Sequence, residues 1–257
     1  MLRSVEDFSI AAAVNDQEIL SSCLQRSPDI LSGELALRTY ENYPSAARAL
    51  NAGLAESSAA IVIFAHQDVY LPEGWLRRLI SQINLLEQND PNWAVIGLYG
   101  RRPTGEEVGL VWSSGLGRVV GQGGFPPTEA VTLDELVLIV RRDSGLRFDE
   151  GIPGFHMYGT DIVMQGRAAG LLSFVVDAPA IHNSRPVRAL TGAYADAYRY
   201  MQRKWRKNLP LSNLSSEIVW HPVKLWRAQW RSIRLYKHNV QRPKRDAVEI
   251  AKSLGYE

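Results

Sequence analysis

The stretch IVIFAHQDVYLPEGWLRRL (residues 61–79) joins an apolar run to a polar cluster and then to an amphipathic segment. The run AAIVIFA (59–65) is continuously apolar, which is typical of a strand covered on both faces. His66, Gln67 and Asp68 follow it directly, and a helix is predicted over 71–88, beginning around Pro72. This order predicts one unit of an α/β sheet with polar side chains at the end of the strand, where such sheets bind ligands.

The remaining chain repeats the alternation of strands and helices. Strands are predicted over 8–14, 33–42, 93–100, 135–142 and 171–178, and helices over 18–27, 45–57 and 160–170. The pattern favours a mainly parallel central sheet flanked by helices. The glycine-rich stretch 113–127 is predicted to be a flexible loop. Its glycine spacing does not follow a clear strand and open a helix, so it is not a dinucleotide-binding fingerprint.

Composition narrows the class of protein. Of 257 residues only Cys23 is a cysteine, which excludes an intramolecular disulfide and a cysteine-rich zinc site and fits a reducing compartment. No signal peptide is visible at the start, and no apolar run reaches the roughly 18–20 residues that span a bilayer. We therefore expect a cytoplasmic protein, and one at the inner face of the membrane if its basic part binds lipid.

Charge divides the chain into two predicted parts. Residues 185–257 carry 16 Lys/Arg and 5 Asp/Glu, whereas residues 1–184 carry 13 and 22. This split predicts a catalytic body over 1–184 and a basic helical C-terminal extension over 185–257.

The extension contains two basic amphipathic segments, 194–207 and 223–240. Three interpretations stay open for them. The apolar stripes pack on the body while the arginines face water, or the helices dock on an anionic membrane with tryptophans at the interface. Nucleic-acid binding is disfavoured, because no DNA- or RNA-binding motif accompanies the charge.

Four side chains carry potential chemistry. Asp68 and His66 lie two residues apart and project to the same side of an extended backbone, where they could contribute to a divalent-metal site. Asp161 lies in the first turn of a predicted helix, where it either stabilises the helix terminus or acts as a general base. His182 is either a structural residue or a ligand placed near Asp68.

The order and spacing of five segments resemble the family 2 glycosyltransferases, and in particular a bacterial subgroup with a His-Gln-Asp-Val acidic motif. The segments are FSIAAAVND (8–16), SAARALNAGLAES (45–57), IVIFAHQDVYLPEGWL (61–76), GLRFDEGIPGFHMYGTDIVMQGRAAG (145–170) and FVVDAPAIHNS (174–184). The resemblance covers most of residues 8–184. It implies the GT-A fold, a Rossmann-like and mainly parallel sheet flanked by helices.

The resemblance also implies roles for individual residues. Asn15 and Asp16 match the place where the nucleotide is held, and Asn51 matches an asparagine on the helix that flanks this pocket. Asp68 matches the last carboxylate of the DXD motif, whose first position is His66 here. His182 matches the histidine that completes the metal shell. Asp161 matches the catalytic aspartate.

The implied activity is inverting transfer of a sugar from a UDP- or GDP-sugar to an acceptor hydroxyl, with Mn²⁺ or Mg²⁺ as cofactor. The expected acceptor is a glycan or a lipid-linked precursor in polysaccharide synthesis, and no nucleic-acid partner is expected. Aromatic residues in the segment 155–158 are candidates for sugar contact. Two alternatives remain. A GT-A-like nucleotidyltransferase would need a basic triphosphate loop, which AVNDQE (13–18) does not supply. A non-enzymatic module would bind membranes or polymers through the basic extension.

Overall fold

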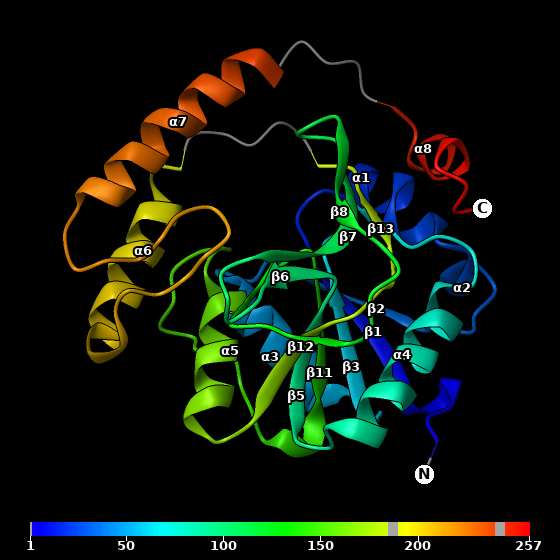
Figure 1. Ribbon diagram of the computed structural model, residues 1–257. Coiled ribbons are helices and arrows are strands. Elements are labelled where there is room, and N and C mark those ends of the chain that lie inside the picture. Colours follow the sequence, from blue (N-terminus) through cyan, green and yellow to red (C-terminus); the bar gives the residue numbers. More distant parts are fainter. Residues whose placement is uncertain (1, 185–189, 240–244) are drawn as a thin grey trace.

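The computed structural model describes residues 2–184, 190–239 and 245–257. Its main sheet has seven strands in the order β2-β1-β3-β11-β5-β12-β9 (Figure 1). These strands are β1 (Phe8–Val14), β2 (Leu37–Glu41), β3 (Ile61–Ala65), β5 (Trp93–Gly97), β9 (Thr128–Glu129), β11 (Val137–Arg141) and β12 (Leu172–Val175). The neighbours β2-β1, β1-β3 and β5-β12 are parallel, whereas β11 is antiparallel to both β3 and β5. The predicted mainly parallel α/β sheet is confirmed.

Helices cover both faces of this sheet. Alternate residues of β3 point to opposite sides, and Ile61 and Ile63 pack in the same buried cluster as α4 (Trp75–Asn89). Val62 and Phe64 belong to the other cluster, with α3 (Ala46–Glu56) and α5 (Tyr158–Ala168). A fully buried aliphatic side chain of this size stabilises the fold by about 1.5–3 kcal/mol. Burial on both faces therefore accounts for the uninterrupted apolar run.

A second sheet lies beside the first, in the order β10-β6-β7-β13-β4, with β8 paired to β7. Its strands are β4 (Val69–Tyr70), β6 (Tyr99–Arg101), β7 (Glu107–Ser113), β8 (Arg118–Gln122), β10 (Thr132–Leu133) and β13 (Ala180–His182). The predicted strand over 93–100 is thus split at Leu98 between the two sheets. This break carries the chain from the main sheet to the smaller one, which contributes part of the site described below.

The prediction of a flexible glycine-rich loop over 113–127 is wrong for β8, which pairs antiparallel with β7 along its length. Gly109 pairs with Gln122 and Gly121 with Leu110, so the two glycines are diagonal neighbours near one end of this hairpin, both with positive φ. A Cβ on Gly121 would come within 1.9 Å of the Gly109 carbonyl oxygen. These two glycines therefore permit a close backbone approach within a hairpin, a use that composition alone does not distinguish from a loop.

Two helices of the C-terminal part pack on the rest of the chain. Tyr198 and Met201 of α6 (Ala193–Lys204) share a buried cluster with Met164 of α5. Ile250 of α8 (Ala247–Ser253) packs with Tyr70 of β4 and Ile181 of β13. The boundary predicted after residue 184 stays a prediction, because residues 185–189 are outside the described part of the chain.

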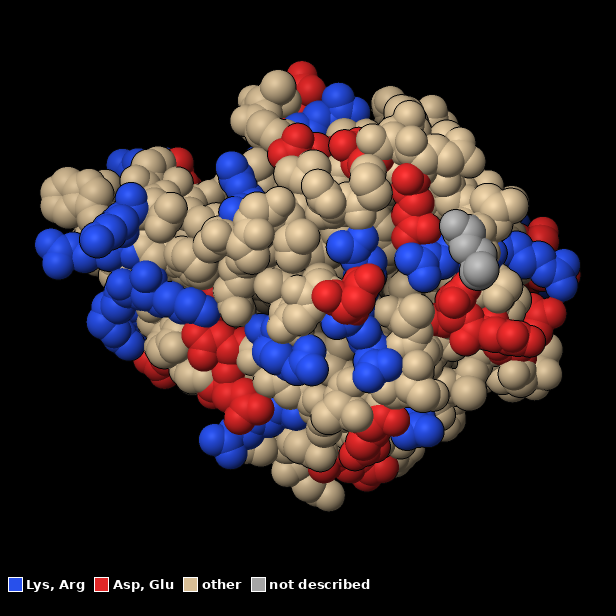
Figure 2. Space-filling model, turned by 90° about the horizontal axis from the view of Figure 1, so that it is seen from below, with Lys and Arg blue, Asp and Glu red and all other residues tan. Residues whose placement is uncertain are grey.

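Helix α7 (Val223–Asn239) lies at the outer edge of the molecule, beyond α6 and away from the main sheet (Figure 1). Seen from below, Lys and Arg side chains gather at the end of the molecule that α6 and α7 occupy, at the left of Figure 2. No helix in the described ranges is both long enough and apolar enough to cross a bilayer. The remaining helical pieces are α1 (Gln17–Ser22), α2 (Pro28–Leu31), η1 (Val5–Asp7), η2 (Leu24–Arg26), η3 (Arg142–Ser144) and η4 (Arg206–Asn208).

Candidate metal and nucleotide site

Strand pairing brings Asp68 and His182 together from distant parts of the chain. Strand β3 ends at Ala65, and the chain then turns through residues 66–68 into the short strand β4. Strand β13 pairs antiparallel with β4 and places His182 opposite Val69. The Asn183 N–H donates to the Asp68 carbonyl at 2.8 Å, which extends the pairing by one residue. The second sheet thus fixes the position of both side chains.

His66, Asp68 and His182 form a compact group of potential ligands. One ligand atom from each residue lies within 4.8 Å of the other two. The His182 Nε2 is 3.4 Å from the Asp68 Oδ1, and the two imidazole rings are 5.7 Å apart between centroids. Two imidazoles and one carboxylate suit a divalent transition metal such as Mn²⁺, because Mg²⁺ prefers an all-oxygen shell. The residues therefore fit a metal of the predicted kind.

The pKa shifts of Asp68 and His66 favour metal binding, whereas the shift of His182 opposes it. Burial tends to raise the pKa of the Asp68 carboxyl, but His182 and then His66 outweigh it and hold that pKa well below its usual value. Burial lowers the pKa of His66. Burial also tends to lower the pKa of His182, but the Asp68 carboxylate outweighs it and raises that pKa. An ionised carboxylate and a neutral imidazole are the forms that bind metals.

Tyr158 orients His66. Its hydroxyl lies 2.7 Å from the His66 Nε2, and it comes from the first turn of α5. If Nε2 carries the proton and donates to the hydroxyl, Nδ1 is left as an acceptor for a metal. A partner on the second ring nitrogen is the usual way in which proteins orient a ligating histidine. Tyr158 lies in the aromatic segment singled out from the sequence, but it contacts a predicted metal ligand.

Two adjoining cavities open beside this group, at the carboxyl ends of β1, β2 and β3. The first, of about 190 Å³, is lined by His66, Gln67, Asp68, Glu135 and Tyr158 among others. The second, of about 260 Å³, is lined by residues that follow β1 and β2, including Asp16, Glu41 and Asn42. Ala13, Val14, Asn15 and Phe155 line both cavities, so the two form one cleft. Phe155 is half-exposed there, which suits a contact surface for a ring.

Asn15 and Asp16, the predicted nucleotide residues, lie in this cleft. The Gln67 Oε1 accepts hydrogen bonds from the Asn15 N–H at 2.9 Å and the Asp16 N–H at 3.1 Å. The Gln67 Nε2 donates to the Asn15 Oδ1 at 2.6 Å. The Asp16 carboxylate caps α1 by accepting from the Ile19 N–H. Gln67 therefore joins the ends of β1 and β3, a role that the sequence did not reveal.

Asn51 does not line either cavity. Its amide donates to the Phe148 carbonyl at 2.9 Å and accepts from the Phe148 N–H at 2.9 Å. Its Nδ2 also lies 3.1 Å from the Glu150 carboxylate. In this structure Asn51 hydrogen-bonds the segment before α5 to helix α3. Its predicted contact with a nucleotide stays a prediction.

Asp161 lines neither cavity and is enclosed by its own partners. Its side chain is only 1% exposed and lies on α5, one turn beyond Tyr158. The carboxylate accepts from the Gln165 amide at 2.7 Å, the Lys204 ammonium at 2.8 Å and the Trp205 indole at 2.7 Å. Lys204 and Trp205 belong to the basic extension. The structure therefore does not bring Asp161 into the cleft with Asp68 and His182.

Glu135 is a carboxylate in the cleft that the sequence interpretation missed. It lines the first cavity, and its Oε1 accepts from the Gly159 N–H at 3.1 Å, at the start of α5. Burial raises the pKa of Glu135 to about 8, although backbone hydrogen bonds from α5 oppose the shift. Because β11 runs antiparallel to β3, residues just before β11 lie at the edge where β3 ends. A parallel strand over 135–142 would place Glu135 at the opposite edge, which is why the sequence interpretation missed it.

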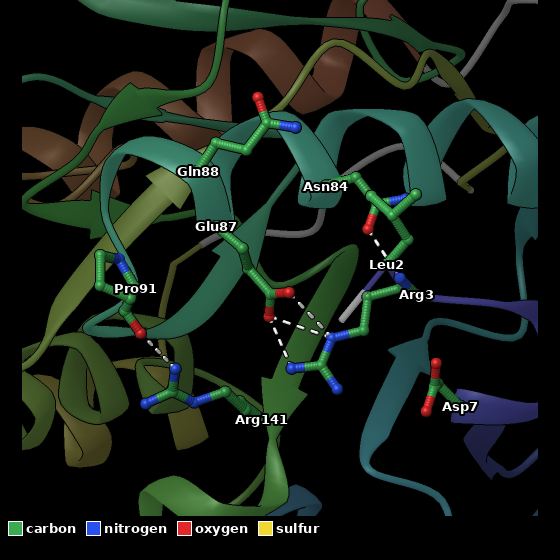
Figure 3. Close-up of a pocket in the computed structure, with 8 residues that line it drawn as sticks. All are labelled: Leu2, Arg3, Asp7, Asn84, Glu87, Gln88, Pro91 and Arg141. Atoms are coloured by element: carbon green, nitrogen blue, oxygen red, sulfur yellow. Dashed lines mark hydrogen bonds and ion pairs between the residues drawn. The ribbon is translucent and has the colours of Figure 1, made fainter.

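A larger hollow of about 580 Å³ lies at the opposite end of the main sheet (Figure 3). It is bounded by residues that precede β1, end α4 and end β11. Arg3 pairs there with Glu87 at 2.6 Å, and Arg141 donates to the Pro91 carbonyl. Both guanidinium groups thus have internal partners, and none of the predicted site residues lies there.

Comparisons with known proteins give limited matches. No protein-family model matches the sequence. A protein of Fuscovulum blasticum named ATP synthase subunits region ORF 6 is 32% identical over 131 residues, which are 49% of this chain and 52% of that protein. The match thus spans about half the length of that curated relative.

Three solved structures are similar at TM-scores below 0.5. The mannosyltransferase PcManGT from Pyrobaculum calidifontis, in complex with GDP-Man and Mn²⁺, has a TM-score of 0.49 and 12% identity over 97% of this chain and 79% of its own. GalNAc-T7 with UDP, GalNAc and Mn²⁺ has a TM-score of 0.46 and 11% identity, over 97% of this chain and 57% of its own. TarS of S. aureus has a TM-score of 0.47 and 15% identity, over 80% of this chain and 40% of its own.

Proposed function

We propose that this protein is a metal-dependent glycosyltransferase of the GT-A type that uses a nucleotide-sugar donor. The observation that carries the proposal is the placement of His66, Asp68 and His182 beside a two-part cleft at the carboxyl edge of the sheet. Ligands bind at this edge in open α/β sheets. The resemblance of five sequence segments to the family 2 enzymes supports the same activity.

The cleft offers a distinct place for each part of a donor. The cavity between the ends of β1 and β2 would hold the nucleoside, with Asn15, Asp16 and the tyrosines Tyr40 and Tyr43 around it. The cavity beside the histidines would hold the diphosphate and the sugar, with Phe155 against a ring. His66, Asp68 and His182 would hold Mn²⁺, which neutralises negative charge on a departing diphosphate when bound.

Two carboxylates are candidates for the base that takes the proton of the acceptor hydroxyl. Asp161 matches the family motif, but it can serve only if Lys204 and Trp205 release it. Glu135 lines the cavity, and its pKa of about 8 is close to the value that suits a general base at neutral pH. The geometry therefore favours Glu135 in the conformation described. Attack opposite the leaving group would invert the anomeric centre, as the resemblance implies.

The alternatives have less support. A nucleotidyltransferase would need cationic side chains near a triphosphate, yet the cavity between β1 and β2 is lined by Asp16 and Glu41. A purely binding module would not require the compact histidine and aspartate group. The binding module therefore does not account for a metal-ligand set that borders a cleft.

A thermal-shift panel tests the proposal. UDP, GDP, CDP and dTDP are each added with and without Mn²⁺, and the melting temperature is recorded. We expect one nucleotide to raise the melting temperature only with Mn²⁺, because a ligand that binds the native state stabilises it by mass action. Asp68→Ala should abolish the rise, whereas Asp143→Ala, which changes an exposed carboxylate, should retain it. The absence of any Mn²⁺-dependent rise would overturn the proposal.

We extend the proposal to peripheral membrane contact through α7. Trp226 and Trp230 are 68% and 55% exposed, and the Arg234 guanidinium lies 3.7 Å from the centre of the Trp230 ring. Exposed tryptophans beside arginines suit the interface of an anionic bilayer.

Sedimentation with vesicles tests this contact. We expect binding to vesicles containing phosphatidylglycerol and not to phosphatidylcholine alone. The paired change of Trp226 and Trp230 to Ala should abolish binding. The matched change of the exposed Leu31 and Leu85 to Ala should leave it intact, and equal binding by both variants would contradict the contact.

A further inference from the structure

A separate cavity of about 360 Å³ lies between the turn that joins β7 to β8 and helix α7. It starts next to the proposed metal site, because its residue Ser113 is the strand partner of His182. The Ser114 N–H also donates to the His182 carbonyl at 3.0 Å. A ligand held in this cavity would therefore lie along the strand that carries a metal ligand, on the side of the basic extension.

The cavity is cationic. Arg227 and Arg231 line it, and their spacing of four places them on one face of α7. Lys224 also lines it but is paired with Glu217 at 2.9 Å. In the described part of the chain, neither Arg227 nor Arg231 has a carboxylate partner.

Glu107 is a further carboxylate that interacts electrostatically with Arg231. Arg231 helps to lower the pKa of Glu107, after the Tyr99 hydroxyl and Arg101. Glu107 is nevertheless paired with Arg101 at 2.8 Å. Two guanidinium groups thus remain available for an anion, and guanidinium binds phosphate oxygens in a bidentate manner.

The other walls combine hydroxyl groups with apolar side chains. Ser113, Ser215 and Ser232 contribute hydroxyls, and Leu116, Leu190 and Leu214 contribute the apolar surface. Leu116 is 39% exposed, so the apolar wall reaches the rim of the cavity. A small inorganic anion would leave this wall uncovered, whereas a phosphate joined to a hydrocarbon chain would contact both kinds of surface.

We infer that this cavity binds an amphiphilic phosphate, with the phosphate on Arg227 and Arg231 and the apolar chain against the leucines. This inference deepens the proposed function and rests on it in one respect: the bound molecule would be the acceptor, or part of it. The binding itself depends neither on the metal nor on the nucleotide cleft.

Isothermal titration tests the inference with three probes on the full chain, without metal or nucleotide. The probes are octyl phosphate, inorganic phosphate and octyl glucoside, each below any micelle-forming concentration. We expect octyl phosphate to bind at least 10-fold more tightly than inorganic phosphate, and octyl glucoside not to bind. The double variant R227Q/R231Q should weaken octyl phosphate binding at least 10-fold. The matched variant Arg167→Gln, at an exposed arginine of α5, should leave it unchanged.

Several outcomes would overturn the inference. They are no binding of octyl phosphate, equal affinity for octyl phosphate and inorganic phosphate, or equal affinity in the wild type and R227Q/R231Q. A Leu116→Ser variant checks the apolar contact separately, and it should weaken octyl phosphate without affecting inorganic phosphate. The Mn²⁺-dependent thermal shift with nucleotide should persist in R227Q/R231Q. If the wild type shows the Mn²⁺-dependent shift but does not bind octyl phosphate, this inference alone is rejected, whereas the absence of that shift in the wild type would reject the proposed function.

Discussion

Asp68 is a partly buried carboxylate beside the cleft and Asp161 a fully buried one on α5, and their surroundings differ. Asp68 faces a cavity and has imidazoles as its neighbours, one of them at 3.4 Å. Asp161 is enclosed by an ammonium, an amide and an indole, each within 2.8 Å. The partners of Asp68 can share a metal with it, whereas the partners of Asp161 satisfy it completely. The difference shows that a motif position identifies a carboxylate, but its neighbours decide whether it can do chemistry.

The largest expected effect distinguishes the two candidate bases. With a sugar donor built on the nucleotide that the thermal-shift panel identifies, Glu135→Gln should lower the rate of nucleoside diphosphate release by about 10²–10⁴-fold, the usual contribution of general base catalysis. Asp161→Asn should lower it less if Lys204 and Trp205 stay in place. Both variants should retain Mn²⁺-dependent nucleotide binding. The reverse ranking of the two rates would return the role of base to Asp161 and require the extension to open.

The next largest effect is expected on the unfolding free energy of a variant at Asp161. Asp161→Ala leaves the Lys204 ammonium and the Trp205 indole without this acceptor, which should cost about 3 kcal/mol of unfolding free energy. Asp149→Ala is the matched control, because its carboxylate also binds Lys204, at 2.6 Å, but is about one-fifth exposed. Its cost should be about 1 kcal/mol. Urea unfolding at neutral pH measures both, and equal costs would contradict the structural role of Asp161.

The third prediction concerns pH and Glu135. Because the pKa of Glu135 rises from 4.5 to about 8 on folding, the folded protein keeps a proton that the unfolded chain releases above pH 4.5. The contribution of this group to stability should therefore fall as pH rises from about 4.5 to about 8.

Glu135→Gln cannot lose that proton. Its unfolding free energy should fall less between pH 5 and pH 8 than that of the wild type, by on the order of 1–3 kcal/mol. Urea titrations at the two pH values test this, and parallel losses in both proteins would show that Glu135 ionises freely.

The smallest effect is expected on Mn²⁺ binding at the group that contains Asp68. Tyr158→Phe removes the hydroxyl that contacts His66 and should weaken Mn²⁺ binding about 10-fold, as loss of an orienting partner usually does. Tyr194→Phe is the control, because that hydroxyl bonds to Ser216 instead. Manganese titration followed by electron paramagnetic resonance gives both affinities. Unchanged affinity in Tyr158→Phe would show that His66 needs no such support.

The sequence was sufficient for the main sheet because its central strands are covered on both faces. A continuous run such as 59–65 and the helices around it follow from local patterns, and the resulting sheet places residues 66–68 at a ligand-binding edge. The approach of His182 to Asp68 required a resemblance, since β4 and β13 are too short to be recognised locally. The partners of Asp161, the role of Gln67 and the position of Glu135 depend on side-chain packing between distant segments, which no local pattern encodes.

The pairing of β4 with β13 has a consequence for biogenesis. Asp68 leaves the ribosome long before His182, so a growing chain can complete the early strands while the metal group is still open. Contacts between such distant segments form late, because loop closure must come first. If this group binds Mn²⁺ as proposed, the metal would stabilise the contact between β4 and β13 at that stage, and a low supply of the metal would reduce the yield of native protein.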